Sequence, residues 1–500
     1  MNNIDTKGSN TVQALWLTLA SLGTFFVSIV SAIILSRYLE KSEYGTYRQI
    51  LFIYTTLSFV FSAGLPRVFQ YFLPRRSIEE GALIVKKINT LLLILGLTFS
   101  LTLFTLSKPL SIILNNPELE IGLKYFSPVP TFLLPTLGIE GIFSSYRKTQ
   151  YISYYNLFSG LLQLTGIVLP VILLGGGYIN AIYGWVGISV LLFLFTLYYK
   201  NIPFKGIATI KTNTIPINEI LSYSIPLVVA SIAGLAIKAA DQYYISRYFG
   251  PEIFAEYTNG FIELPFVFMI TGATSAVVMP LFSKIIHDKS DINNLITLWK
   301  SAILKSATLI YPLVIFFFTF ANQTMEILFS TKYAHSVNYF RINLILNLFN
   351  IVIFAPLFFS MGKTKLYATI HIILAIIIWI IDYLLVSFSL SSFSIAIANT
   401  TIHIIKILVF ISIGSRLLKI RFIDLFPVKY LIKLLIHSSL SIGTTLLVFK
   451  FVNLSKITLI VYLIISGIIY ILTLLMYSRI FNIQYFNILK PIITKISVFR

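Results

Sequence analysis

The chain has 500 residues, of which 57% are hydrophobic and only 11% charged, and it carries a formal net charge of +20. Soluble domains usually carry about 25% charged residues, so the composition excludes a soluble globular protein and predicts an all-α polytopic membrane protein. The apolar runs are continuous and about 20 residues long, which excludes the alternating strands of an outer-membrane barrel. The chain has no cysteine and its five histidines are scattered, so no disulfide, no metal and no cofactor are expected.

Fourteen apolar stretches follow one another along the chain, and each is predicted to be a transmembrane helix. They cover approximately 12–35, 49–72, 84–106, 122–145, 152–174, 178–199, 220–245, 257–280, 298–320, 338–360, 366–388, 393–415, 430–449 and 457–477. The first is too long for a signal-peptide core and lacks a convincing small-residue cleavage site, so we expect it to be retained. Prolines inside the spans predict kinks, and they are Pro66, Pro128, Pro130, Pro135, Pro170, Pro226, Pro265, Pro312 and Pro356.

The basic residues between the spans predict the topology. With the amino terminus in the cytoplasm, the termini and even-numbered links hold 23 Lys and Arg residues, whereas the odd-numbered links hold 9. Cytoplasmic loops carry the excess of Lys and Arg, so both termini are predicted to be cytoplasmic. The net charge is then explained by topology and by contact with lipid headgroups, and nucleic acid is not an expected partner.

A short polar link recurs at an offset of 210 residues. The sequence S-R-Y-L-E-K-S-E-Y-G-T-Y at 36–47 returns, altered, as S-R-Y-F-G-P-E-I-F-A-E-Y at 246–257, each time between two apolar stretches. The repeat pairs spans 1–6 with spans 7–12, and an even number of spans in each copy makes the two lobes parallel. We therefore predict an N-lobe at 1–210, a C-lobe at 211–425, and spans 13–14 with a cytoplasmic tail at 426–500.

These motifs resemble those of a known family. The first link, with S-Y-S-I-P-L at 222–227, Asp241, and L-F-S-T-K-Y at 328–333, is similar to bacterial polysaccharide flippases of the Wzx type. They belong to the multidrug/oligosaccharidyl-lipid/polysaccharide (MOP) superfamily. The resemblance implies two helical lobes around a central cavity. It also implies translocation of undecaprenyl-diphosphate-linked oligosaccharide repeat units across the bacterial cytoplasmic (inner) membrane, by alternating access, for O-antigen, capsule or exopolysaccharide assembly.

Charged side chains inside the spans are the candidate site residues, because each costs roughly 2.5–3.5 kcal/mol at the bilayer centre. A phosphate in low dielectric needs fixed positive partners, so four basic residues are predicted to bind the substrate: Arg67, Lys238, Lys406 and Arg341. Four acidic residues are candidate gating or ion-coupling groups: Asp241, Glu140, Glu263 and Asp382. The alternative is structural ion pairing, of Arg67 with Glu140 and of Lys238 with Asp241.

Arg37 and Arg247 begin the two repeated links. They are predicted to lie at the membrane interface, where they either contact headgroups and hold the outer gate or cap helix ends.

Three rival functions stay open. A multidrug or other lipid exporter of the same superfamily should have an acidic cavity if its substrates are cationic. A membrane glycan polymerase or glycosyltransferase should carry a large extracytoplasmic loop or acidic pairs at a span end. A scramblase or peptidoglycan-precursor flippase has the same sequence-level features.

The longest non-spanning stretches are about twenty residues, too short for a catalytic domain, so we expect a transporter and not an enzyme. The expected partners are the lipid-linked oligosaccharide, membrane lipids, and the polymerase and glycosyltransferases of glycan assembly. The driving force stays open between an H+ or Na+ gradient, the membrane potential and removal of the product outside.

Overall fold

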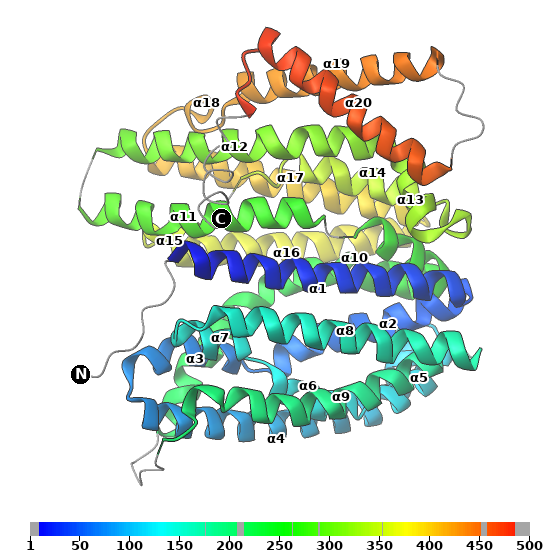
Figure 1. Ribbon diagram of the computed structural model, residues 1–500, viewed down its shortest axis with the longest axis vertical. Coiled ribbons are helices and arrows are strands. Elements are labelled where there is room, and N and C mark those ends of the chain that lie inside the picture. Colours follow the sequence, from blue (N-terminus) through cyan, green and yellow to red (C-terminus); the bar gives the residue numbers. More distant parts are fainter. Residues whose placement is uncertain are drawn as a thin grey trace. The chain divides into compact units, whose positions relative to one another are not determined.

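The computed structural model describes residues 10–175, 177–207, 215–262, 264–288, 291–352, 354–451 and 458–485. Throughout these ranges the regular structure is helical, and no strand is found in them. By its contacts the chain forms two compact units, Met1–Ala255 and Glu256–Arg500. Within each unit most of the long helices run side by side with their axes nearly parallel or antiparallel (Figure 1).

The first unit contains the helices from α1 to most of α10. They are α1 (Asn10–Tyr38), α2 (Lys41–Phe61), α3 (Leu65–Phe72), η1 (Leu73–Arg75), α4 (Ile78–Ile113), α5 (Glu118–Phe126), α6 (Val129–Leu133), η2 (Leu134–Thr136), α7 (Ile139–Ser145), α8 (Thr149–Leu174), α9 (Tyr178–Lys200), η3 (Ile202–Phe204) and α10 (Ile217–Gly260). Side chains fix several helix starts. Ser77 accepts a hydrogen bond from the backbone N–H of Glu80 at 3.3 Å, and Glu40 and Glu43 form a capping box at the start of α2.

The second unit holds the remaining helices. They are α11 (Pro265–His287), α12 (Ile292–Thr319), α13 (Ala321–Phe329), η4 (Thr331–Tyr333), α14 (Ser336–Asn347), α15 (Phe354–Ser360), α16 (Thr364–Ser387), α17 (Ser392–Leu417), α18 (Phe422–Leu425), α19 (Val428–Phe451) and α20 (Leu459–Ile480). The last two helices pack on each other, and α19 packs on α12. Their shared seam is polar: His437 Nε2 is 3.1 Å from the carbonyl of Leu474, and the Tyr470 hydroxyl donates to the carbonyl of Pro312 at 3.0 Å.

The all-α polytopic fold class is confirmed. By length and apolar composition, 10 helices in the described ranges can cross a membrane, and up to 12 if two bent helix pairs each count as one span. The other two of the fourteen predicted spans correspond to α11 and to the interrupted pair α14 and α15. The count of fourteen, the cytoplasmic termini and the lobe boundaries stay predictions.

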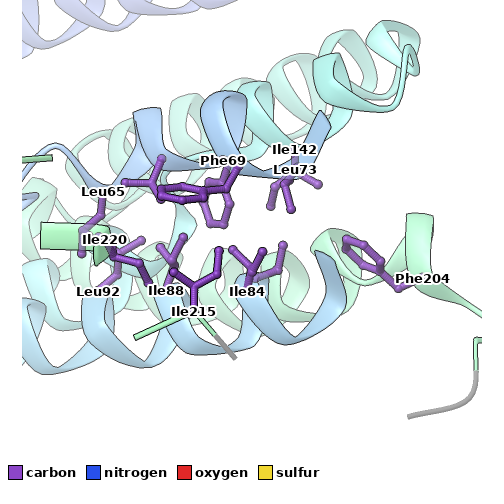
Figure 2. Close-up of a cluster of buried hydrophobic side chains, with 13 residues drawn as sticks. Leu65, Phe69, Leu73, Ile84, Ile88, Leu92, Ile142, Phe204, Ile215 and Ile220 are labelled. Carbon is purple, nitrogen blue, oxygen red and sulfur yellow. The ribbon is translucent and has the colours of Figure 1, made fainter. Parts of the chain in front are cut away.

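One buried cluster organises the part of the first unit around α3. It is formed by Leu65, Val68, Phe69, Phe72, Leu73, Ile84, Val85, Ile88, Leu92, Ile142, Phe204, Ile215 and Ile220 (Figure 2). Its members come from α3, η1, α4, α7, η3, the start of α10 and Ile215 just before it, so segments from Leu65 to Ile220 share one core. Close packing, more than water exclusion, holds helices together in a bilayer, and this cluster fixes the short helix α3.

Candidate functional site

The second predicted span is broken. Helix α2 ends at Phe61, α3 begins at Leu65, and the two axes meet at 44°. Two successive left-handed residues make the break, Ala63 with φ 48° and Gly64 with φ 67°. Pro66 then occupies the first turn of α3, where its missing N–H costs no helical hydrogen bond.

Helix α10 passes close to the break. A Cβ on Gly64 would lie 2.9 Å from the carbonyl oxygen of Ser224 and 3.1 Å from the side chain of Val228. Glycine at this position therefore meets two requirements at once, a positive φ and a close backbone approach. Helix α10 is itself bent, with Ile217–Pro226 and Ser231–Gly260 meeting at 51°.

The break and α10 line a half-open cavity of about 180 Å³. Its lining residues are Phe59, Ser62, Gly64, Pro66, Arg67 and Val228. Arg67 is exposed, and it is the one ionisable residue among these lining residues. The structure thus places one of the four predicted substrate-binding residues in the wall of a cavity.

The amphipathic pattern of α3 determines on which face of the helix Arg67 lies. Leu65, Val68, Phe69 and Phe72 follow the i, i+3, i+4, i+7 spacing of one helix face, and all four are buried. They pack into the cluster of Figure 2, so the face that carries Arg67 lies on the other side of α3.

The fourth predicted span is broken in a similar way. Between α6 and α7 the chain forms η2, which contains Pro135, and then turns through Gly138 with φ 93°. Here Lys200, at the end of α9, fills the break. Its ammonium group donates to Asn89 Oδ1 at 2.9 Å and to the carbonyls of Pro135 at 2.7 Å and Leu137 at 2.5 Å.

Lys200 is fully buried, and its nitrogen lies 5.5 Å from the centre of the Phe69 ring. The three N–H donors of an ammonium group match its three acceptors. By its position in the sequence, Lys200 is one of the 23 basic residues of the termini and even-numbered links that predict the topology. The carbonyls of Pro135 and Leu137 lie at the break between η2 and α7, and Lys200 supplies the donors for them.

The proposed pairing of Arg67 with Glu140 is not observed. Helices α3 and α7 pack on each other, but both side chains are exposed, and no ion pair joins them among the described residues. The remaining candidates of the first unit lie on α1 and α10. Lys238 is exposed and Asp241, one turn later, is half-buried, with its Oδ1 accepting from the backbone N–H of Gln242 at 2.8 Å.

The two link arginines lie in different settings. Arg37 is exposed in the last turn of α1. Arg247 is half-buried, donates to the carbonyl of Ile113 at the end of α4, and lies 5.3 Å from the Tyr248 ring. A cation at the carbonyl end of a helix satisfies orphan acceptors, which agrees with the capping alternative for Arg247.

In the second unit the candidates Arg341, Asp382 and Lys406 lie on α14, α16 and α17. Lys406 lies 3.0 Å from Nδ1 of His403 and is near enough to His371 to act on it electrostatically. Asp382 is fully buried and accepts a hydrogen bond from Asn399 at 3.1 Å.

Arg341, on α14, lies 5.9 Å from the Phe318 ring. Glu263 lies outside the described residues. Across the described ranges, no group of three His, Asp or Glu side chains is placed to hold a metal ion.

The family is settled by comparison with known proteins. The profile of the family described as "Polysaccharide biosynthesis protein" matches residues 34–338, which is more than half of the chain. The chain belongs to this family. The matched region contains both repeated links, the two broken spans, Arg67 and Lys200.

Solved structures show the same fold. The lipid II flippase MurJ, in an inward closed conformation, matches with a TM-score of 0.71 at 15% identity, over 93% of this chain and 98% of that one. An inward-facing multidrug resistance MATE family transporter of the MOP superfamily matches with a TM-score of 0.63 at 17% identity, over 83% and 96%.

A MOP superfamily transporter from Pyrococcus furiosus matches with a TM-score of 0.59 at 15% identity, over 83% of this chain and 97% of that one. No curated protein sequence matches the chain. The protein is therefore a multi-pass membrane protein of the polysaccharide biosynthesis family with the MOP transporter fold.

Proposed function

We propose that this protein is a flippase that moves undecaprenyl-diphosphate-linked oligosaccharide across the bacterial cytoplasmic membrane, and that it is not an enzyme. Family membership and the MOP fold support a transporter of polysaccharide precursors. The observation that carries the substrate class is the cavity at the α2–α3 break, whose one ionisable lining residue is Arg67.

A diphosphate leaves water only if fixed donors replace its hydration. A guanidinium can offer two parallel N–H donors to phosphate oxygens, and such charge-assisted hydrogen bonds are about twice as strong as neutral ones. In this proposal Arg67 binds the diphosphate, the sugar and diphosphate cross inside the protein, and the lipid tail stays in the bilayer. Lys238, Lys406 and Arg341 are proposed as further basic residues that bind the diphosphate as it crosses the membrane.

Coupling of transport to an ion gradient is assigned to the acidic residues. Asp382, buried and hydrogen-bonded by Asn399, has the environment of a group whose protonation or ion occupancy changes the local structure. Asp241, Glu140 and Glu263 are kept as further coupling or gating candidates. H+ and Na+ are the candidate ions.

The test is transport by the purified protein in proteoliposomes. A fluorescent undecaprenyl-diphosphate oligosaccharide in the inner leaflet should become accessible to a sugar-modifying enzyme added outside, and empty vesicles should show no such change. A cationic dye should not be moved. Movement of the dye but not of the lipid-linked sugar would reverse the assignment in favour of the multidrug alternative.

A further inference from the structure

An arginine at the end of η1 rests on two stacked tyrosine rings. The guanidinium of Arg75 lies over the ring of Tyr71, 3.7 Å from its centroid. The Tyr71 ring in turn stacks on the ring of Tyr223, with 4.0 Å between the centroids and 24° between the planes. Tyr71 belongs to α3 and Tyr223 to α10. We name these three side chains the Arg75 stack.

The two rings are a fixed support. Both meet Phe72 edge to face, Tyr71 at 4.9 Å and Tyr223 at 5.9 Å. Phe72 is 4% exposed and belongs to the buried cluster around α3, and both tyrosines pack against that cluster. The arginine that lies on these rings is therefore held in place before any ligand arrives, which lowers the ordering cost of binding.

The donors of Arg75 are left over for a ligand. Its side chain is exposed, and among the described residues no carboxylate pairs with it and no acceptor takes a hydrogen bond from it. The neighbouring Arg76, by contrast, lies 3.9 Å from Glu80. A guanidinium carries five N–H donors, and stacking on a ring occupies its face but none of these donors.

Arg75 lies where the chain passes from one span to the next. It ends the bent pair Lys41–Phe61 and Leu65–Arg75, and the following candidate span, Ile78–Ile113, begins three residues later. A residue between two consecutive spans lies near the membrane surface, where the phosphate groups of lipids are found. The predicted topology places this link on the cytoplasmic side.

The same side of α3 connects the Arg75 stack to the cavity. Arg67, Tyr71 and Arg75 follow one another at steps of four residues, the spacing of neighbours on one helix face. Eight residues of helix correspond to about 12 Å along the axis. A phosphate held at Arg75 is thus about two helical turns from the arginine that lines the cavity.

We infer that the Arg75 stack is a binding site for the phosphate group of a membrane lipid, separate from the Arg67 cavity. A guanidinium offers two parallel N–H donors to phosphate oxygens. An anionic phospholipid and an undecaprenyl diphosphate both carry this chemistry. The short distance to Arg67 favours the diphosphate. The stack is then the first binding site of the transported lipid, an assignment that rests on the proposed function.

Binding to the purified full-length protein in detergent tests the site. The probe is farnesyl diphosphate with a fluorescent label on the isoprenoid end, followed by fluorescence polarisation. All variants are made in an Arg67→Gln background, so that the cavity does not contribute. Arg75→Gln removes the guanidinium, Tyr71→Leu removes its support, and Tyr71→Phe keeps the ring. The control is Arg76→Gln, which removes the same charge one position away.

Arg75→Gln should raise the Kd of the labelled farnesyl diphosphate at least about ten-fold, because a charge-assisted contact is lost. Tyr71→Leu should also raise the Kd, whereas Tyr71→Phe and Arg76→Gln should leave it unchanged. Because Arg75 is exposed, the melting temperature of Arg75→Gln should stay that of its parent. An unchanged Kd in Arg75→Gln, or an equal rise in Arg76→Gln, overturns the inference.

A fluorescent phosphatidylglycerol, titrated in the same way, distinguishes the two sources of phosphate. Dependence of farnesyl diphosphate binding on Arg75 supports the first binding site of the transported lipid. Dependence of phosphatidylglycerol binding alone supports a site for an anionic phospholipid and rejects that role in transport.

Transport in proteoliposomes separates this inference from the proposed function. Arg75→Gln should raise the concentration of lipid-linked oligosaccharide that gives half-maximal flux and leave the maximal flux unchanged, whereas Arg67→Gln should lower the flux at every concentration. If the wild-type protein moves no lipid-linked sugar but its binding of farnesyl diphosphate depends on Arg75, the proposed function fails and the phosphate site stands. Normal wild-type transport with binding that ignores Arg75 keeps the function and overturns the site.

Discussion

Two broken spans of the first unit look alike in sequence but differ in the burial and hydrogen bonding of the basic residue that lies at the break. Each break contains a proline and a left-handed glycine, Gly64 in one and Gly138 in the other, and each is followed by a short helix. At the second break the ammonium group of Lys200 is buried and its three donors are used by protein acceptors. At the first break Arg67 is exposed on a cavity of about 180 Å³.

The difference separates a structural cation from a candidate ligand-binding one. A buried cation with all donors matched stabilises the local fold and has none left for a ligand. An arginine on a cavity wall can exchange water for phosphate oxygens. The comparison therefore predicts that removing Lys200 damages folding, whereas removing Arg67 damages transport.

The largest effect on stability is expected for Lys200→Met. Two carbonyls and one amide oxygen lose their donor, and each unsatisfied buried acceptor costs about 1–3 kcal/mol. Membrane abundance and melting temperature in detergent should both fall strongly. Lys205→Met, five positions later at an exposed site, is the control and should behave as wild type. Normal abundance and melting of Lys200→Met would erase the distinction between the two breaks.

A smaller effect is expected for Gly64→Ala. A left-handed L-residue costs about 1–2 kcal/mol, and the new methyl group would press on the Ser224 carbonyl at 2.9 Å. Abundance should fall moderately, and transport per molecule should fall with it because α10 is displaced from the cavity. Gly187→Ala is the control, because a Cβ added at Gly187 would meet no neighbouring heavy atom within 4 Å. This substitution within a helix should be neutral or slightly stabilising. The comparison fails if both variants behave alike.

The smallest effect is expected at a surface pair. Arg421 donates to Asp424 at 2.9 Å in the link between α17 and α19, and this hydrogen bond lowers the pKa of the Asp424 carboxyl. A lowered folded-state pKa gives stability that is present above the ordinary carboxyl pKa and is lost as the pH falls through the folded-state value.

Exposed pairs contribute little, so Asp424→Asn should leave the melting temperature at pH 7 unchanged within error. A melting curve recorded at pH 7 and again in acid checks both halves of this expectation. A clear drop in the melting temperature of Asp424→Asn at pH 7 would mean that this exposed ion pair stabilises the protein as strongly as a buried one.

Proline positions predicted part of the helix breaks. The chain is broken or bent at Pro66, Pro135 and Pro226, whereas α8 continues through Pro170 and α12 continues through Pro312. Proline acts through its own backbone, so its effect is visible locally. The place of Arg67 on the free face of α3 follows equally from the spacing of its apolar neighbours, although its part in substrate binding stays a prediction.

The role of Lys200 could not be predicted in the same way. Its acceptors lie 63, 65 and 111 positions away in sequence, on segments that meet only after folding. A lysine that ends an apolar stretch looks the same whether it faces water or three buried oxygens. The pairing of Arg67 with Glu140 was reasonable from similar depth, but depth does not fix which helix face carries a side chain.

The most direct test of the central claim compares Arg67→Gln with Arg76→Gln in the proteoliposome assay, with flux divided by the amount of reconstituted protein. Arg76 is exposed nearby, lies 3.9 Å from Glu80 and does not line the cavity. Loss of a charge-assisted contact of about 1.5–3 kcal/mol predicts that Arg67→Gln lowers the flux by at least a factor of about ten, at normal abundance. Arg76→Gln should match wild type. Wild-type flux of the lipid-linked oligosaccharide through Arg67→Gln would contradict the account.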